Sequence, residues 1–234
     1  MRIFIYYITL SLLIISCNKR SAESKAEIKS QVISQKEDQS SELPIVKEVM
    51  GDLDHDGVEE RVVIYETKEK TEYGNIRELQ VQKKENNKWI KWHSSTNAIL
   101  KSGDGGMMGD PLDLMEIKDG ILNISFFGGS SWKWSYTDKY RFQNNHFELI
   151  GYTHTYFKLC EYWETSDYNL VTGKLVVKKE YEKCENQKQF FYKSENETFN
   201  KKIDAITLNN RNQKEIIFES PKYKHRISIS SGNL

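Results

Sequence analysis

Short stretches in which apolar and polar residues alternate recur along most of this 234-residue chain, and turn residues separate them. Alternation places every second side chain on one face of a strand, so each stretch predicts a strand with one buried face. No stretch keeps a helical period for three turns. The pattern predicts an all-β domain built from an antiparallel meander, which forms a curved sheet, a sandwich or a partly closed barrel.

Turn residues predict where the hairpins close. Asp119-Gly120 is the strongest two-residue hairpin signal, and Asn86-Asn87 and an Asn-Asn pair before Phe147 mark two others. Thr172-Gly173 is a further turn candidate. Shorter strands, typical of the edge or closing strands of a sheet, are expected at 189–193, 203–208, 215–218 and 226–229.

Composition excludes two classes of protein. Aromatic residues make up 12% of the chain, which is too many for a disordered polymer and enough to build a core. Lys plus Arg and Asp plus Glu number 34 each, whereas a dedicated nucleic-acid binder carries a basic excess or stripe. We therefore expect a folded domain with no nucleic-acid partner.

The N-terminal segment predicts export. Arg2 precedes a run from Ile3 to Ile15 that is almost wholly apolar but shorter than the roughly 20 residues needed to span a bilayer. Ile14-Ile15-Ser16-Cys17 closes this run and resembles the lipobox of bacterial lipoproteins. The resemblance implies a signal peptide at 1–16, acylation of Cys17 and attachment to a membrane through the acyl chains.

The expected organisation has two parts after the signal peptide. Residues 17–43 are rich in Ser, Lys, Glu and Gln and contain no aromatic residue, so they predict a flexible, lipid-anchored tether. A single β domain is expected at 44–234. Because no acidic cluster follows Cys17, the lipoprotein resemblance implies a place in the bacterial cell envelope, at the outer membrane and facing the periplasm.

An aspartate-rich loop opens the predicted domain. Oxygen atoms in a tight loop suit Ca²⁺, and the candidate ligands are the side chains of Asp52, Asp54, Asp56 and Glu60 with the backbone carbonyl of Val58. Position twelve of an EF-hand would require Glu but is Val63, and a β-branched run follows. The loop resembles the calcium loops of FG-GAP and VCBS-type repeats, which implies a structural calcium ion; the alternative is an acidic β-turn without metal.

A glycine-rich segment at 101–111 is the most unusual part of the chain. With Gly128-Gly129-Ser130-Ser131-Trp132-Lys133-Trp134, it resembles an uncharacterised group of exported bacterial lipoproteins that carry an aspartate-rich loop, over about residues 48–152. That resemblance implies no activity. Candidate ligand-binding residues are Met107, Met108, Trp132 and Trp134. Alternation puts Trp132, Trp134 and Tyr136 on one face, which favours packing in the core as the alternative role.

The carboxylates of the glycine-rich segment are the only catalytic candidates. Asp104 and Asp110 could supply an acid and a base for glycoside cleavage, with Asp113 and Glu116 nearby. The spacing does not require this role, and the histidines lack metal-ligand spacing. We expect a non-catalytic module that binds an envelope protein or a glycan; the alternative is a polysaccharide or cell-wall hydrolase.

The remaining cysteines predict a disulfide. A hairpin centred on residue 172 would place Cys160 opposite Cys184, close enough for a bond between neighbouring strands. Export would expose these thiols to an oxidising compartment. The alternative is a pair of reduced, buried thiols.

Overall fold

The computed structural model describes residues 43–186, 188–213 and 216–229. The predicted signal peptide, Cys17 and all but the last residue of the predicted tether lie outside the described residues. The described residues all belong to one compact unit. Strands dominate the part of the chain that is described, which confirms the all-β prediction, and no helix there is long and apolar enough to cross a membrane.

The strands have the following bounds: β1 (Ile45–Gly51), β2 (Glu60–Thr71), β3 (Gly74–Glu85), β4 (Lys88–Ser95), β5 (Leu112–Lys118), β6 (Ile121–Gly129), β7 (Lys133–Gln143), β8 (His146–Lys158), β9 (Tyr162–Asn169), β10 (Lys174–Glu185), β11 (Lys188–Asn200), β12 (Ile216–Glu219) and β13 (Arg226–Ile229). A short 3₁₀ turn, η2, covers Gly106–Met108.

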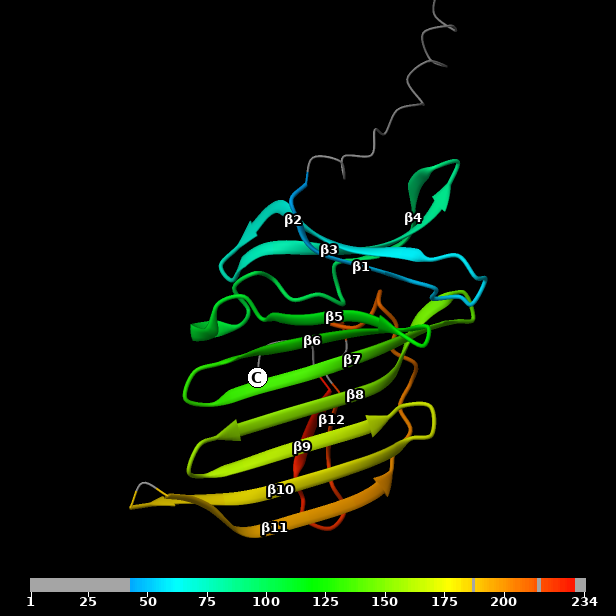
Figure 1. Ribbon diagram of the computed structural model, residues 1–234. Helices are drawn as coiled ribbons and strands as arrows, with labels where there is room; N and C mark the ends of the chain where they lie inside the picture. Colours follow the sequence, from blue (N-terminus) through cyan, green and yellow to red (C-terminus); the bar gives the residue numbers. More distant parts are fainter. Residues whose placement is uncertain (1–42, 187, 214–215, 230–234) are drawn as a thin grey trace, which may run out of the picture. The chain divides into compact units, whose positions relative to one another are not determined.

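Two open antiparallel sheets contain most of these strands. Strands β1 to β4 form a four-stranded sheet, and β5 to β11 form a seven-stranded sheet, here called the large sheet, with neighbours in sequence order (Figure 1). Positive φ angles at Asn86, Asn144 and Asp119 close the hairpins. Asn, Asp and Gly adopt this conformation most readily, so the turns formed where the sequence predicted them.

One hydrophobic core joins the two sheets. On β6, the alternate residues Leu122, Ile124 and Phe126 are buried and belong to the same cluster as Ile64 of the four-stranded sheet. The sheets meet where β1 lies beside β5. At this point Gly51 leaves no room for a larger residue, because an added Cβ would lie 2.6 Å from a methyl group of Ile117.

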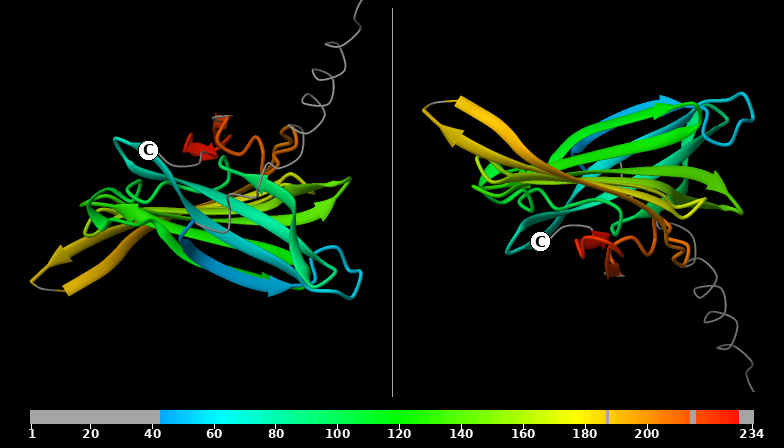
Figure 2. Two further views of the ribbon diagram at one scale, coloured as in Figure 1. Left: turned by 90° about the horizontal axis from the view of Figure 1, so that it is seen from above. Right: turned by 90° about the horizontal axis from the view of Figure 1, so that it is seen from below.

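The C-terminal segment covers part of one face of the large sheet. Strands β12 and β13 form a two-stranded sheet that lies on this face in Figures 1 and 2. The Phe218 ring lies 6.5 Å from that of Tyr168, and the Tyr152 hydroxyl donates to the Ser228 carbonyl at 3.4 Å. The sequence predicts edge or closing strands in this segment. Strands β12 and β13 close the domain by packing on one face of the large sheet and do not extend its edge.

The strand predicted at 203–208 is wrong. Only Thr207 makes a β-bridge, to Glu148, and the backbone then turns as Thr207 N–H donates to the Asn210 side chain. β9 pairs with β8 only from Gly151 onward, so the beginning of β8 has an open edge that accepts this short contact. Ile206 is buried there, so hydrophobic packing holds this segment in place and not a ladder of strand hydrogen bonds.

A buried ion pair lies between the C-terminal segment and the large sheet. Arg211 Nε donates to Asp138 Oδ2 at 2.7 Å, and the two side chains are 0% and 1% exposed. The Tyr140 hydroxyl also donates to Asp138. Both charges are therefore removed from water and depend on each other.

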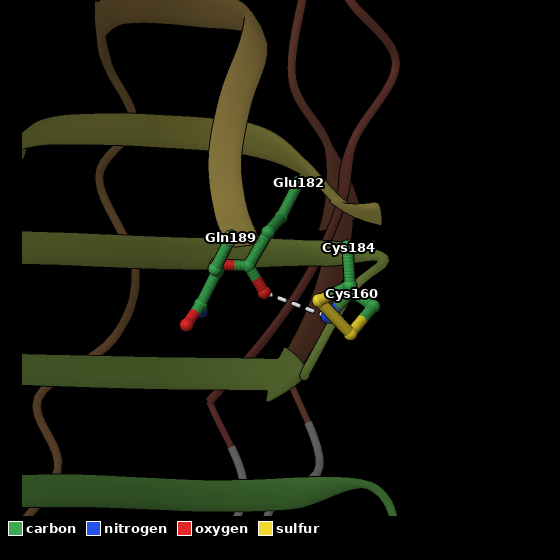
Figure 3. Close-up of a disulfide and its surroundings, with 4 residues drawn as sticks. All are labelled: Cys160, Glu182, Cys184 and Gln189. Carbon is green, nitrogen blue, oxygen red and sulfur yellow. Dashed lines mark hydrogen bonds between the residues drawn. A yellow bond between two sulfur atoms is a disulfide. The ribbon is translucent and has the colours of Figure 1, made fainter. Parts of the chain in front are cut away.

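The Cys160–Cys184 disulfide is formed, but the predicted register is wrong by one residue (Figure 3). The β9–β10 ladder pairs Tyr162 with Tyr181, and its continuation would place Lys183 opposite Cys160. Cys160 instead lies in the β8–β9 turn with a φ of 66°, which brings its Cα to 5.1 Å from that of Cys184. The Glu182 carboxylate accepts the Cys160 N–H at 2.7 Å and holds this turn in place.

Candidate functional site

The aspartate-rich loop connects β1 to β2 and is closed by its own carboxylates. Asp52 Oδ2 accepts the Gly57 N–H at 3.0 Å, and Asp54 Oδ1 accepts the Asp56 N–H at 3.2 Å. Gly57 has a φ of 86°, which permits the reversal. These bonds fix the loop in a conformation that directs carboxylates toward a common point.

Asp52, Asp54 and Glu60 form a cluster in which one oxygen of each lies within 4.8 Å of the others. Glu60 is 1% exposed, and its Oε2 accepts the Leu53 N–H at 2.8 Å. Burial raises the pKa of Glu60, while the bond from Leu53 opposes this shift. Asp52 Oδ1 is buried without a hydrogen-bond partner among the described residues. An oxygen cluster with an unsatisfied buried acceptor fits a hard cation such as Ca²⁺.

Asp56, another predicted calcium ligand, lies next to this cluster and shares Lys83 with it. Asp56 Oδ1 accepts the Val58 N–H at 2.8 Å, and its Oδ2 lies 3.4 Å from Lys83 Nζ. The side chains of Asp52, Asp54 and Glu60 thus lie together, and the Asp56 carboxylate lies outside this group.

Lys83, which no sequence pattern singles out, contacts the acidic cluster. Its ammonium contacts the Asp54 carboxylate and lies 3.6 Å from Glu60 Oε1. It also lies 4.2 Å from the centroid of the Trp92 ring. A positive charge of the protein itself therefore already offsets part of the negative charge of the loop, and a metal ion would compete with it.

The glycine-rich segment is held by backbone hydrogen bonds at positions where side chains would not fit. Gly129 N–H donates to the Gly105 carbonyl at 2.9 Å, and Gly105 N–H donates to Gly109 at 3.1 Å. A Cβ on Gly105 would lie 2.3 Å from the Gly109 oxygen, and one on Gly128 would lie 2.9 Å from Gly105 Cα. The glycines thus allow the loop to lie directly against the end of β6.

A pocket of about 460 Å³ opens between this loop and the aromatic residues that follow β6. Its lining consists of Asp104, Gly106, Met107, Gly129, Ser130, Trp132, Trp134 and Tyr156. Trp132 stacks on Tyr156 with ring centroids 5.4 Å apart and planes 5° apart. Met107 is 86% exposed at the rim. Met107, Trp132 and Trp134 therefore share one pocket, and Met108, which is 46% exposed, is not in its lining.

The two tryptophans have different environments. Trp134 packs against the hydrophobic core and stacks on Tyr136 at 5.8 Å, as the core alternative for this residue predicts. Trp132 precedes β7, is only partly buried, and has the Lys158 ammonium 4.7 Å from its ring centroid. The inner wall of the pocket is thus anchored in the core, whereas its outer wall faces water.

Asp104 and Asp110 have separate partners. The Asp104 side chain is 7% exposed, and its Oδ2 accepts the Lys101 N–H at 2.8 Å. Asp110 accepts two hydrogen bonds from the guanidinium of Arg77, which is 2% exposed. Burial raises the pKa of Asp110, but the bonds from Arg77 and from Leu112 N–H more than offset it, and the net shift is downward. An acid held ionised in this way is a poor proton donor.

No family model, no curated protein and no solved structure matches this chain. The geometry of the acidic loop and the pocket is therefore the basis of the functional proposal.

Proposed function

We propose that this protein is a lipid-anchored binding protein of the bacterial envelope, with a calcium-stabilised β domain that binds a glycan or an envelope protein without catalysis. The pocket beside the glycine-rich loop carries this proposal. Aromatic faces line it, and Met107 at its rim can adapt to a ligand. The hydrolase alternative gains no support, because Asp110 is engaged by Arg77.

Ligand titration tests the pocket. Tryptophan fluorescence would be followed while neutral gluco-, xylo-, manno- and chito-oligosaccharides are added to the folded protein. Trp132→Ala is expected to abolish binding, because it removes the outer wall. Trp89→Ala is the matched control, since Trp89 lies on β4 and is not part of the pocket lining. Equal binding by wild type and Trp132→Ala would contradict the assignment of this pocket.

The calcium proposal has its own test. Calcium at 100 times its dissociation constant would stabilise the domain by about 2.7 kcal/mol. We expect chelation to lower the melting temperature, and Glu60→Gln to remove the difference between calcium and chelator. Lys83→Met should raise calcium affinity, because the tethered ammonium no longer competes for Asp54. A melting temperature unaffected by calcium in all three proteins would refute the site.

Anchoring is tested in cells. Metabolic labelling with palmitate should label the full-length protein, and Cys17→Ser should leave it unlabelled and released from the membrane fraction. Recovery of unlabelled wild-type protein in the soluble fraction would exclude acylation.

A further inference from the structure

The pocket is one end of a longer row of aromatic side chains, here called the aromatic strip. Its members are Trp132, Tyr156, Tyr162, Tyr181 and Tyr192. Trp132 lies just before β7, and the tyrosines belong to β8, β9, β10 and β11 respectively. The strip therefore crosses neighbouring strands of the large sheet, at the end where the glycine-rich loop lies (left in Figure 1).

Successive rings of the strip are in contact distance of one another. After the Trp132–Tyr156 stack, ring centroids are separated by 6.5 Å from Tyr156 to Tyr162, by 6.5 Å from Tyr162 to Tyr181, and by 6.2 Å from Tyr181 to Tyr192. Tyr162 and Tyr181 are directly paired across β9 and β10, so they share one face. A bulge in β11 at Tyr192, opposite the Tyr181–Glu182 step of β10, adds the Tyr192 ring to the row. The rings thus form one continuous surface.

The same face of the large sheet is covered elsewhere but not along the strip. Segment 216–229 packs over Tyr152 and Tyr168, and its last contact toward the strip is His225, whose Nε2 lies 3.1 Å from Glu195. Beyond that point, the members of the strip are partly exposed, and Tyr192 is 53% exposed. An aromatic row that continues past its cover is available to a ligand.

Three lysines beside the strip are paired with carboxylates, and the ammonium of a fourth, Lys183, lies 4.9 Å from the centroid of the Tyr192 ring. Lys158 contacts Glu161, Lys179 lies 2.8 Å from Glu164, and Lys193 lies 2.5 Å from Glu195. Each pair offers hydrogen-bond donors and acceptors without adding net charge. Burial, followed by the nearby Glu164 carboxylate, raises the pKa of Tyr162 to about 12, so its hydroxyl keeps its proton at neutral pH.

We infer that the aromatic strip binds an extended, uncharged polysaccharide chain, which starts in the pocket and crosses the strands toward the tip of β10 and β11. This inference rests on the proposed function, because the pocket holds one end of the chain. Sugar rings present C–H groups that lie against the faces of aromatic rings, and their hydroxyls exchange hydrogen bonds with the paired charges. An anionic polymer would instead have to compete with Glu161, Glu164 and Glu195 for the three paired lysines.

Chain length provides the test. The oligosaccharide series that binds best would be titrated as a disaccharide and as a hexasaccharide. The wild type should bind the hexasaccharide at least about tenfold more tightly, because the longer chain reaches further rings. Tyr181→Ala should remove about tenfold of hexasaccharide affinity and leave disaccharide affinity unchanged. Tyr181→Phe keeps the ring and should bind like wild type, which separates lost stacking from misfolding.

Control variants distinguish the possible failures. Tyr73→Ala removes a tyrosine that is 52% exposed in the turn between β2 and β3, and it should change neither affinity. Disaccharide binding that depends on Trp132 without any gain from chain length would overturn the strip and leave the pocket standing. If no oligosaccharide binds, neither the pocket nor the aromatic strip is a glycan-binding site. Tighter binding of heparin or oligo(dT) than of neutral chains would overturn the strip.

Discussion

One face of the large sheet carries tyrosines and oppositely charged pairs at both of its ends, but water reaches only one end. At the covered end, Arg211 and Asp138 are 0% and 1% exposed beneath the C-terminal segment. At the open end, Lys179 and Glu164 form a similar pair at 15% and 16% exposure beside the aromatic strip. The same residue types therefore hold the fold together at the covered end and present a polar, aromatic surface at the open end.

The difference lies in the cost of separating the charges. A fully dehydrated charge that loses its partner is uncompensated, whereas a partly hydrated one is solvated by water. The covered end should respond to substitution through stability, and the open end through ligand binding.

The largest expected effect is at the covered end. Arg211→Met leaves Asp138 buried without its counter-charge and should lower the free energy of unfolding by about 3–5 kcal/mol. Urea denaturation measures this loss. Lys179→Met is the matched control at the open end and should cost about 1 kcal/mol or less. Equal losses in the two variants would show that the ends do not differ as described.

The disulfide links the β8–β9 turn to β10 at the open end. Replacing both cysteines with serine should lower the free energy of unfolding by about 3 kcal/mol, because the unfolded chain loses a closed loop with a separation of 24 residues. Hydrogen exchange should quicken at the ends of β9, β10 and β11 beyond this global change. Extra exchange confined to the covered end would contradict the placement of this link.

His154 lies at the boundary between the two ends, with its ring 6.1 Å from Tyr152 and 6.5 Å from Tyr156. Burial lowers its pKa from 6.5 to about 4. Between pH 6.5 and about pH 4, His154 therefore binds a proton in the unfolded chain but not in the folded one. The free energy of unfolding falls as the pH falls through this window. At pH 5 the loss relative to neutral pH should approach about 2 kcal/mol.

His154→Gln removes this titration, so the difference in stability between pH 7 and pH 5 should shrink. His146→Gln changes an exposed histidine in the β7–β8 hairpin and serves as the control. The hypothesis fails if both variants keep the pH dependence of the wild type.

Local signals in the sequence predicted much of the fold. Turns such as Asp119-Gly120 act through backbone conformations that a few residues determine, and alternation then assigned the buried face of β6. The acidic loop was predictable for the same reason, since Asp52, Asp54 and Glu60 are near neighbours in the chain.

Partners that are distant in the sequence could not be predicted. Arg211 is 73 residues from Asp138, Arg77 is 33 from Asp110, and Lys83 is 29 from Asp54. The β2–β3 ladder also has a register shift between Glu66 and Lys70. The position of the β2–β3 turn therefore does not determine which residue of β3 faces the acidic loop. Lone charged residues give no signal of their partner, so these contacts emerge only from the packed structure.

Only a small change in stability is expected from replacing the residue with the largest expected role in binding. Trp132→Ala should alter the free energy of unfolding by about 1 kcal/mol or less, because its ring lies at the water-facing wall of the pocket. Phe126→Ala, at a side chain only 1% exposed on the core face of β6, should cost about 3–5 kcal/mol. A loss of several kcal/mol from Trp132→Ala would mean that this ring supports the fold, and that the open end is stabilised in the same way as the covered one.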